Sequence, residues 1–185
     1  MLDEVVSDAS SRMDGTIEAM RKELATIRTG RASVTLLDGI EVEAYGSGMP
    51  LNQVATLAVP EPSMITVKPF DISLLGDIEK AILKADLGIN PNNDGKLIRL
   101  PVPPLTEERR KQLARKVSEI AEKGKTAVRN VRRDANEMIK QMEKDGDAGQ
   151  DDARRSLDQV QKATDDHVST LDKMASAKEA ELMEE

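Results

Sequence analysis

The chain has 185 residues and a formal net charge of -7, with 33% of its residues charged and only two aromatic, Tyr45 and Phe70. This length is enough for one or two domains, and their cores must be built from aliphatic side chains and the nine methionines. The absence of cysteine excludes disulfides and thiol chemistry. No apolar run approaches the roughly 18 residues of a membrane span, and the acidic start does not resemble a secretory leader. We therefore expect a cytoplasmic location without membrane contact.

The composition changes twice along the chain. All eight prolines lie between Pro50 and Pro104, and residues 31–105 carry 15 charged side chains in 75 positions, against 46 in the 110 positions outside. Proline interrupts helices, whereas dense mixed charge covers their solvent faces. We therefore expect helical segments at residues 1–30 and 105–185, and an inserted β/α/β domain at residues 31–104.

The first helical segment repeats an apolar residue at every third or fourth position, which is the period of one buried helix face. The rhythm stops at Gly30, so we expect this helix to end just before that glycine. Its apolar positions are Val6, Ala9, Met13, Ile17, Met20, Leu24 and Ile27.

The inserted segment alternates apolar and polar residues and is divided by glycine, proline and asparagine, which favours short strands. A broad apolar face predicts one helix among them. The expected elements are strands at 40–45, 56–59, 64–68 and 97–100, a helix at 73–86, and turns at 46–50 and 90–95.

The last segment predicts two long helices separated by a turn at Gly146 and Gly149. Thr106 is a suitable N-cap for the first of them. Three long helices with one apolar stripe each bury those stripes most simply in an antiparallel three-helix bundle, so the expected fold class is α+β. The apolar positions of these two helices are Leu113, Val117, Ile120, Ala127, Val131, Ala135, Met138 and Met142, and then Leu157, Val160, Thr164, Val168, Leu171, Ala175 and Leu182.

Two segments connect the insertion to the helices. Glycine in the first permits backbone rotation, whereas the prolines of the second keep it extended. We interpret the pair as a directed hinge, although the same residues also serve as ordinary helix stop and start signals. The hinge residues are Thr29, Gly30, Arg31 and Ala32 in the first segment, and Pro103, Pro104 and Leu105 in the second.

A basic stripe runs along the middle helix of this acidic protein. From Thr106 to Gly146 the chain carries 12 basic and 8 acidic residues, a local net charge of +4. On a helical wheel the stripe lies off the apolar face, and arginine forks pair with phosphate oxygens. Two interpretations stay open: an RNA-binding face, or a solvated or partner-facing surface neutralised by Glu122, Asp134 and Glu137. The candidate contacts are Lys125, Arg129, Arg132 and Arg133, with Asn136 as an amide that reads a base edge or a ribose hydroxyl.

No motif for catalysis or for a cofactor is present. The glycines around Ser47 form a hairpin turn rather than a phosphate loop, and the acidic residues after Asp145 lack the twelfth-position glutamate of a calcium loop, where Ser156 stands. His167 has no triad partners and reads as structural or solvated. We expect no catalytic residue, no metal and no cofactor, and therefore a protein that is not an enzyme.

Four segments resemble the bacterial ribosome recycling factor family. They are Val128–Asn136 in the basic stripe, Ile27–Ala32 and Pro103–Lys111 at the two connections, and Asp86–Pro91 in the insertion. The resemblance covers essentially the whole chain, including its length and the order of its segments.

The resemblance implies an L-shaped, monomeric protein of roughly transfer-RNA dimensions that binds the post-termination ribosome. The bundle contacts the ribosomal RNA of the large subunit, with Arg132 as the principal residue and Arg129 and Arg133 beside it. Elongation factor G hydrolyses GTP and splits the subunits, and messenger and transfer RNA leave with the help of an initiation factor. The competing interpretation, based on the apolar rhythm and the high charge, is a helical scaffold or chaperone-like module that binds proteins.

Overall fold

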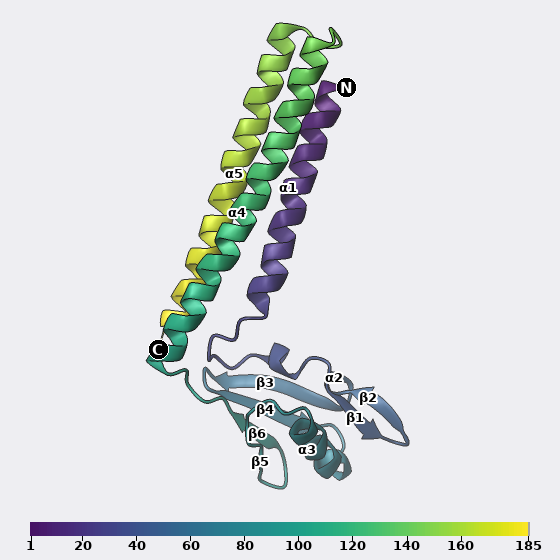
Figure 1. The fold of residues 1–185 in the computed structure, drawn as a ribbon. Coiled ribbons are helices and arrows are strands. Elements are labelled where there is room, and N and C mark those ends of the chain that lie inside the picture. Colours follow the sequence, from purple (N-terminus) through teal and green to yellow (C-terminus); the bar gives the residue numbers. More distant parts are fainter. Residues whose placement is uncertain (185) are drawn as a thin grey trace. The chain divides into compact units, whose positions relative to one another are not determined.

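The computed structural model describes residues 1–184 and divides into two compact units (Figure 1). One unit comprises Met1–Arg28 and the chain from Glu107 onward, and the other comprises Thr29–Thr106. None of the helices within residues 1–184 combines the length and apolar character that crossing a bilayer requires.

The first unit is a bundle of three long helices, α1 (Leu2–Ala25), α4 (Glu107–Lys144) and α5 (Gln150–Met183). They lie side by side, with α4 antiparallel to the other two (Figure 1). The turn between α4 and α5 contains Gly146 at φ +82°, a conformation that glycine adopts without strain. The predicted α+β fold, with its three-helix bundle and inserted strands, is confirmed.

The bundle core is aliphatic and follows the predicted stripes. One position on α4 differs, because Met138 was expected inside and is 53% exposed, whereas the adjacent Ile139 is fully buried. The buried residues Val131, Ala135 and Ile139 are spaced by four, so the stripe continues at Ile139 rather than one residue earlier. The other side chains with no exposed surface are Met13, Val117, Val128, Ala153, Val160, Leu171 and Leu182.

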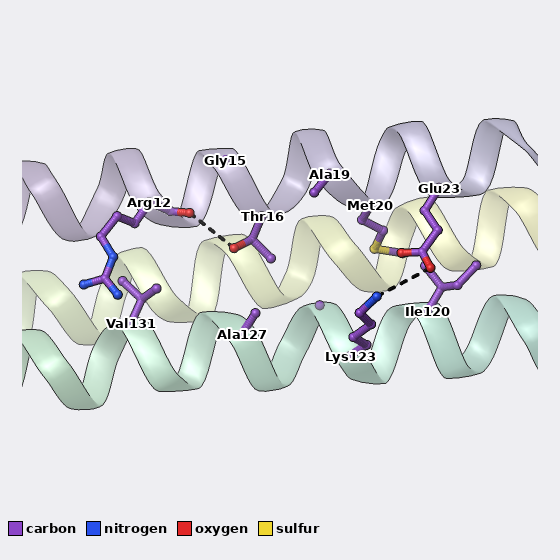
Figure 2. A pocket seen from close by; sticks show the side chains of 11 residues that line it. Arg12, Gly15, Thr16, Ala19, Met20, Glu23, Ile120, Lys123, Ala127 and Val131 are labelled. Atoms are coloured by element: carbon purple, nitrogen blue, oxygen red, sulfur yellow. Dashed lines mark hydrogen bonds and ion pairs between the residues drawn. The ribbon is translucent and has the colours of Figure 1, made fainter.

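Small residues leave a mostly apolar groove between α1 and α4 (Figure 2). Gly15 and Ala19 face it from α1, and Gly124 and Ala127 face it from α4. An ion pair of 3.7 Å between Lys123 and Glu23 lies across it.

Gly124→Ala is expected to stabilise the bundle by about 1 kcal/mol, because glycine is the poorer helix former. A Cβ at this position would lie 3.4 Å and 3.5 Å from the two Cδ atoms of Leu171 and 3.6 Å from the sulfur of Met20, which are ordinary packing distances. Denaturant unfolding would measure the change. Gly15→Ala is the control, since its Cβ would meet no atom within 4 Å. A Gly124→Ala protein less stable than wild type would show that these neighbours cannot adjust.

The second unit contains a two-stranded hairpin, a four-stranded antiparallel sheet and one main helix (Figure 1). The hairpin consists of β1 (Glu41–Ala44) and β2 (Ser47–Pro50), and the sheet has the order β3–β4–β6–β5. Its strands are β3 (Ala55–Glu61), β4 (Met64–Pro69), β5 (Asn92–Asn93) and β6 (Ile98–Pro101). The helices are α3 (Leu75–Lys84) and the single turn α2 (Leu51–Val54), with 3-10 turns at Val34–Leu37 and Ile72–Leu74.

The core of this unit is aliphatic, and its members with no exposed surface are Val42, Ile65, Val67, Ile78, Ile98 and Leu100. Both aromatic residues lie on its surface instead, with Tyr45 73% and Phe70 69% exposed. The Tyr45 hydroxyl donates a hydrogen bond of 2.8 Å to Asp71, and this bond raises the pKa of Tyr45. The expectation of a core without aromatic side chains is confirmed.

Two strands were missed in the sequence, and the expected helix is shorter than predicted. Segments 46–50 and 90–95 were interpreted as turns because they are rich in glycine, proline and asparagine, yet they contain β2 and β5. These strands pair with β1 and β6, so neighbouring strands override their weak local preference. The helix expected from residue 73 begins at Leu75, because Asp71 first caps a 3-10 turn by accepting from the Ser73 amide.

Both connecting segments form backbone hydrogen bonds to the turn between β3 and β4. The Ala32 amide donates to the Pro62 carbonyl at 2.7 Å, and the Val102 amide donates to the Ser63 carbonyl at 2.8 Å. Gly30 has φ +78°, and a Cβ there would lie 3.0 Å from Leu105 Cγ. The two segments thus lie in contact with each other before they leave the insertion.

Asp94 organises the turn between β5 and β6. Its carboxylate accepts from the amides of Leu97 and Lys96, both at 2.9 Å, and from the Arg99 guanidinium. These hydrogen bonds, first that of Leu97, lower the pKa of Asp94 from 3.8 to about 2.

The lowered pKa predicts an acid-sensitive contribution to the stability of the insertion. A carboxyl group with a lower pKa in the folded chain stabilises the fold fully above its unfolded value and loses this contribution as the pH falls toward its folded value. Asp94→Asn is therefore expected to reduce the loss of stability between about pH 4 and about pH 2. Denaturant unfolding at several pH values would measure it, and equal acid slopes for the two proteins would contradict the assignment.

Candidate nucleic-acid interface on α4

The three arginines of the basic stripe are presented differently by the bundle. Arg129 and Arg133 are exposed, and neither has an ion-pair partner among residues 1–184. Arg132 is half-buried against α5, where its Nη1 donates to Gln161 Oε1 at 3.4 Å. All three therefore keep an uncompensated positive charge, the property that phosphate binding needs.

Lys125 is placed differently from these arginines. Its side chain is only 16% exposed, and its ammonium lies 2.7 Å from Asp172 on α5 and 2.8 Å from Glu122 on α4. These partners, first Asp172, raise the pKa of Lys125. The side chain thus joins two helices, and a phosphate would have to compete with two carboxylates for it.

Asn136 does not present its amide oxygen to solvent. The Oδ1 atom is buried and has no hydrogen-bond partner among residues 1–184. A base edge or ribose hydroxyl that donates a hydrogen bond therefore cannot reach this acceptor in the structure as it stands.

Two of the three acidic residues that could neutralise the stripe are paired, and one of them is paired within it. Glu122 forms an ion pair with Lys125, so the stripe is neutralised at that lysine, whereas Asp134 accepts a bond of 3.0 Å from Arg12 on α1. Arg12 and Gln161 belong to other helices than the stripe they adjoin. No pattern in the sequence links them to it, because their proximity results only from helix packing.

His167 links α5 to α1. Its Nε2 lies 2.8 Å from Asp14 and its Nδ1 lies 2.6 Å from the Ala163 carbonyl, and the side chain is 13% exposed. The residue therefore has a structural role, which was one of the two expected. Within residues 1–184 no group of three or more His, Asp or Glu side chains is arranged to hold a metal ion.

The expected hinge residues all lie within or beside the two connecting segments. Arg31 and Ala32 follow Gly30 in the first segment, and Leu105 reaches back to Gly30 from the second. Pro103 and Pro104 have no backbone N–H, so the second segment has no amide to donate there.

These features define a class of protein: a three-helix bundle with a basic outer face, interrupted by a small α/β insertion. The family model described as ribosome recycling factor matches residues 20–183. The ribosome-recycling factor of Desulfatibacillum aliphaticivorans is 52% identical, and that of Bacillus subtilis (strain 168) is 50% identical, each over 184 residues and 100% of both chains. The chain belongs to the ribosome recycling factor family.

Two solved structures share the fold. A solution structure of the ribosome recycling factor matches with a TM-score of 0.75 and 40% identity, over 98% of this chain and 97% of that one. The second is described as models for the T. thermophilus ribosome recycling factor and the E. coli elongation factor G bound to the E. coli post-termination complex. It matches with a TM-score of 0.63 and 41% identity over the whole of both chains.

Proposed function

We propose that this protein binds the post-termination ribosome and, together with elongation factor G, separates its subunits so that messenger and transfer RNA are released. The main support is membership of the ribosome recycling factor family over essentially the whole chain. The related structure on a post-termination complex with elongation factor G supports the same partners. Because it acts on ribosomes, we place the protein in the cytoplasm.

In this proposal the bundle is the RNA-binding part. Arg129, Arg132 and Arg133 contact backbone phosphates of large-subunit ribosomal RNA, since their charges are not neutralised by neighbouring carboxylates. The bundle contains no Phe, Tyr or Trp side chain, which argues against base stacking in the interface. Lys125 contributes by holding α4 to α5 beside the arginines.

The protein carries out no chemistry of its own in this proposal. GTP hydrolysis belongs to elongation factor G, and the factor transmits the resulting movement as a binding protein rather than as an enzyme. The apolar stripes of α1, α4 and α5 are buried against one another, which favours a monomer.

We propose that the backbone bends in the connecting segments, between the helices and the two hydrogen-bonded residues Ala32 and Val102. The hydrogen bonds to Pro62 and Ser63 fix these two residues to the insertion. Bending is therefore concentrated in Thr29, Gly30 and Arg31 on one side, and in Pro103, Pro104 and Leu105 on the other.

A subunit-splitting assay tests the proposal. Light scattering of post-termination ribosomes is expected to fall when the protein, elongation factor G and GTP are all present, and to stay constant when any one is omitted. Wild-type protein that binds large subunits but gives no splitting with a matched elongation factor G would contradict the proposed function.

A further inference from the structure

The arginine at the centre of the basic stripe is held by a neutral side chain. Gln161 Oε1 accepts from Arg132 at 3.4 Å, and the same amide donates through Nε2 to Asp165 Oδ1 at 2.8 Å. Arg132 lies on α4, whereas Gln161 and Asp165 lie four residues apart on α5. The three side chains form a continuous chain of hydrogen bonds across two helices.

The chemistry of these groups determines which way the amide faces. An ionised carboxylate only accepts hydrogen bonds, so Asp165 requires the NH2 end of Gln161 on its side. The carbonyl oxygen then faces Arg132, whose guanidinium only donates. Without the Asp165 carboxylate, the Gln161 amide could rotate and turn its NH2 group toward the Arg132 guanidinium, so that two hydrogen-bond donors would face each other.

The neutrality of this partner distinguishes Arg132 from Lys125 and Arg12, which have carboxylate partners. Lys125 lies between two carboxylates, and Arg12 is paired with Asp134. An amide acceptor orients a guanidinium without cancelling its charge. Arg132 is therefore held in place and still able to attract an anion.

We propose that Gln161 is a positioning residue for RNA binding, which orients the Arg132 guanidinium toward a phosphate, and that Asp165 fixes the Gln161 amide. The inference rests on the proposed function, because it requires that Arg132 binds ribosomal RNA. It extends the functional surface from α4 to α5.

The decisive variant is Asp165→Ala, with Asp166→Ala as its matched control. Both remove one negative charge from exposed neighbouring positions on α5, so electrostatics alone predicts equal or tighter RNA binding for both. Alanine also removes the oxygen that accepts from Gln161, so positioning predicts that Asp165→Ala binds isolated large subunits about threefold more weakly, the effect of one lost hydrogen bond. Asp165→Ala that binds as tightly as Asp166→Ala would overturn the proposal.

A second pair of variants tests the neutrality of the partner. Gln161→Glu should form an ion pair with Arg132 and lower the slope of log affinity against log salt by about 1, the loss of one phosphate contact. Gln159→Glu adds the same charge to an exposed position of α5 without touching Arg132, and should leave the slope unchanged. Equal slopes for the two variants would contradict the inference.

An Arg132→Ala background separates positioning from a general structural effect. In that background Asp165→Ala should cause no further loss of binding, because no guanidinium remains to be oriented. An undiminished loss would overturn the proposal. If Arg132→Ala alone did not weaken binding, the proposed function of the basic face would fail as well, so the two failures can be told apart.

Discussion

Arg132→Glu is expected to weaken binding to isolated large ribosomal subunits by about 10- to 100-fold, the range of one charge-assisted hydrogen bond. The substitution removes an uncompensated positive charge and places a carboxylate against the RNA backbone. Folding should be nearly unaffected, because among residues 1–184 the guanidinium makes one side-chain hydrogen bond, to Gln161 at 3.4 Å, and no ion pair. Helicity and melting temperature should therefore match those of wild type.

Sedimentation with large subunits at several salt concentrations would measure this effect. Wild-type affinity should fall steeply with salt, and Arg132→Glu should reduce the log-log slope by at least about 1. Lys116→Glu is the matched control, since this exposed lysine lies on the same helix roughly 160° around the axis from Arg132. Equal pelleting of the wild-type and Arg132→Glu proteins would refute a role for Arg132 in binding.

Periodicity predicted the helices well because each long helix buries one apolar stripe along its whole length. The steps of three and four residues in α1 and α5 required no knowledge of neighbours. β2 and β5 were not recognised, because Gly48, Pro50 and the asparagines of β5 are poor strand formers that depend on pairing with β1 and β6. Local sequence carries no information about that pairing.

The candidate interface was predictable only along a single helix. The wheel placed the arginines off the core, and the structure has Arg129 and Arg133 exposed. The wheel could not show that Asp172 would form an ion pair with Lys125, or that the Oδ1 atom of Asn136 would be buried. These outcomes depend on how α5 and α1 pack against α4, as do the contacts of Arg12 and Gln161.

Gly30→Ala is expected to destabilise the insertion and its connections by two separate effects. A non-glycine residue at φ +78° costs about 1–2 kcal/mol. In addition, the new Cβ would lie 3.0 Å from Leu105 Cγ and 3.4 Å from the Leu105 backbone nitrogen. Moving the two segments apart to relieve this contact should cost a further 1–3 kcal/mol, roughly, as in other overpacked sites.

Gly39→Ala should show the first effect alone, so the difference between it and Gly30→Ala measures the second effect, the close contact with Leu105. Gly39 has nearly the same conformation, φ +80°, but a Cβ there would meet no atom within 4 Å. Unfolding measurements should thus show a smaller loss for Gly39→Ala than for Gly30→Ala. The double variant Gly30→Ala with Leu105→Ala should recover part of the difference, because it removes the Cγ atom that the new methyl group meets.

The functional consequence should separate binding from splitting. Gly30→Ala leaves the arginines of α4 unchanged, so its affinity for large subunits should stay near that of wild type. The rate of ribosomal subunit splitting with elongation factor G should fall. Bending would require the two connecting segments, displaced by the new methyl group, to move past each other. If Gly30→Ala split ribosomes as fast as Gly39→Ala while being less stable, the close contact would serve folding alone and movement would have to occur elsewhere in the connecting segments.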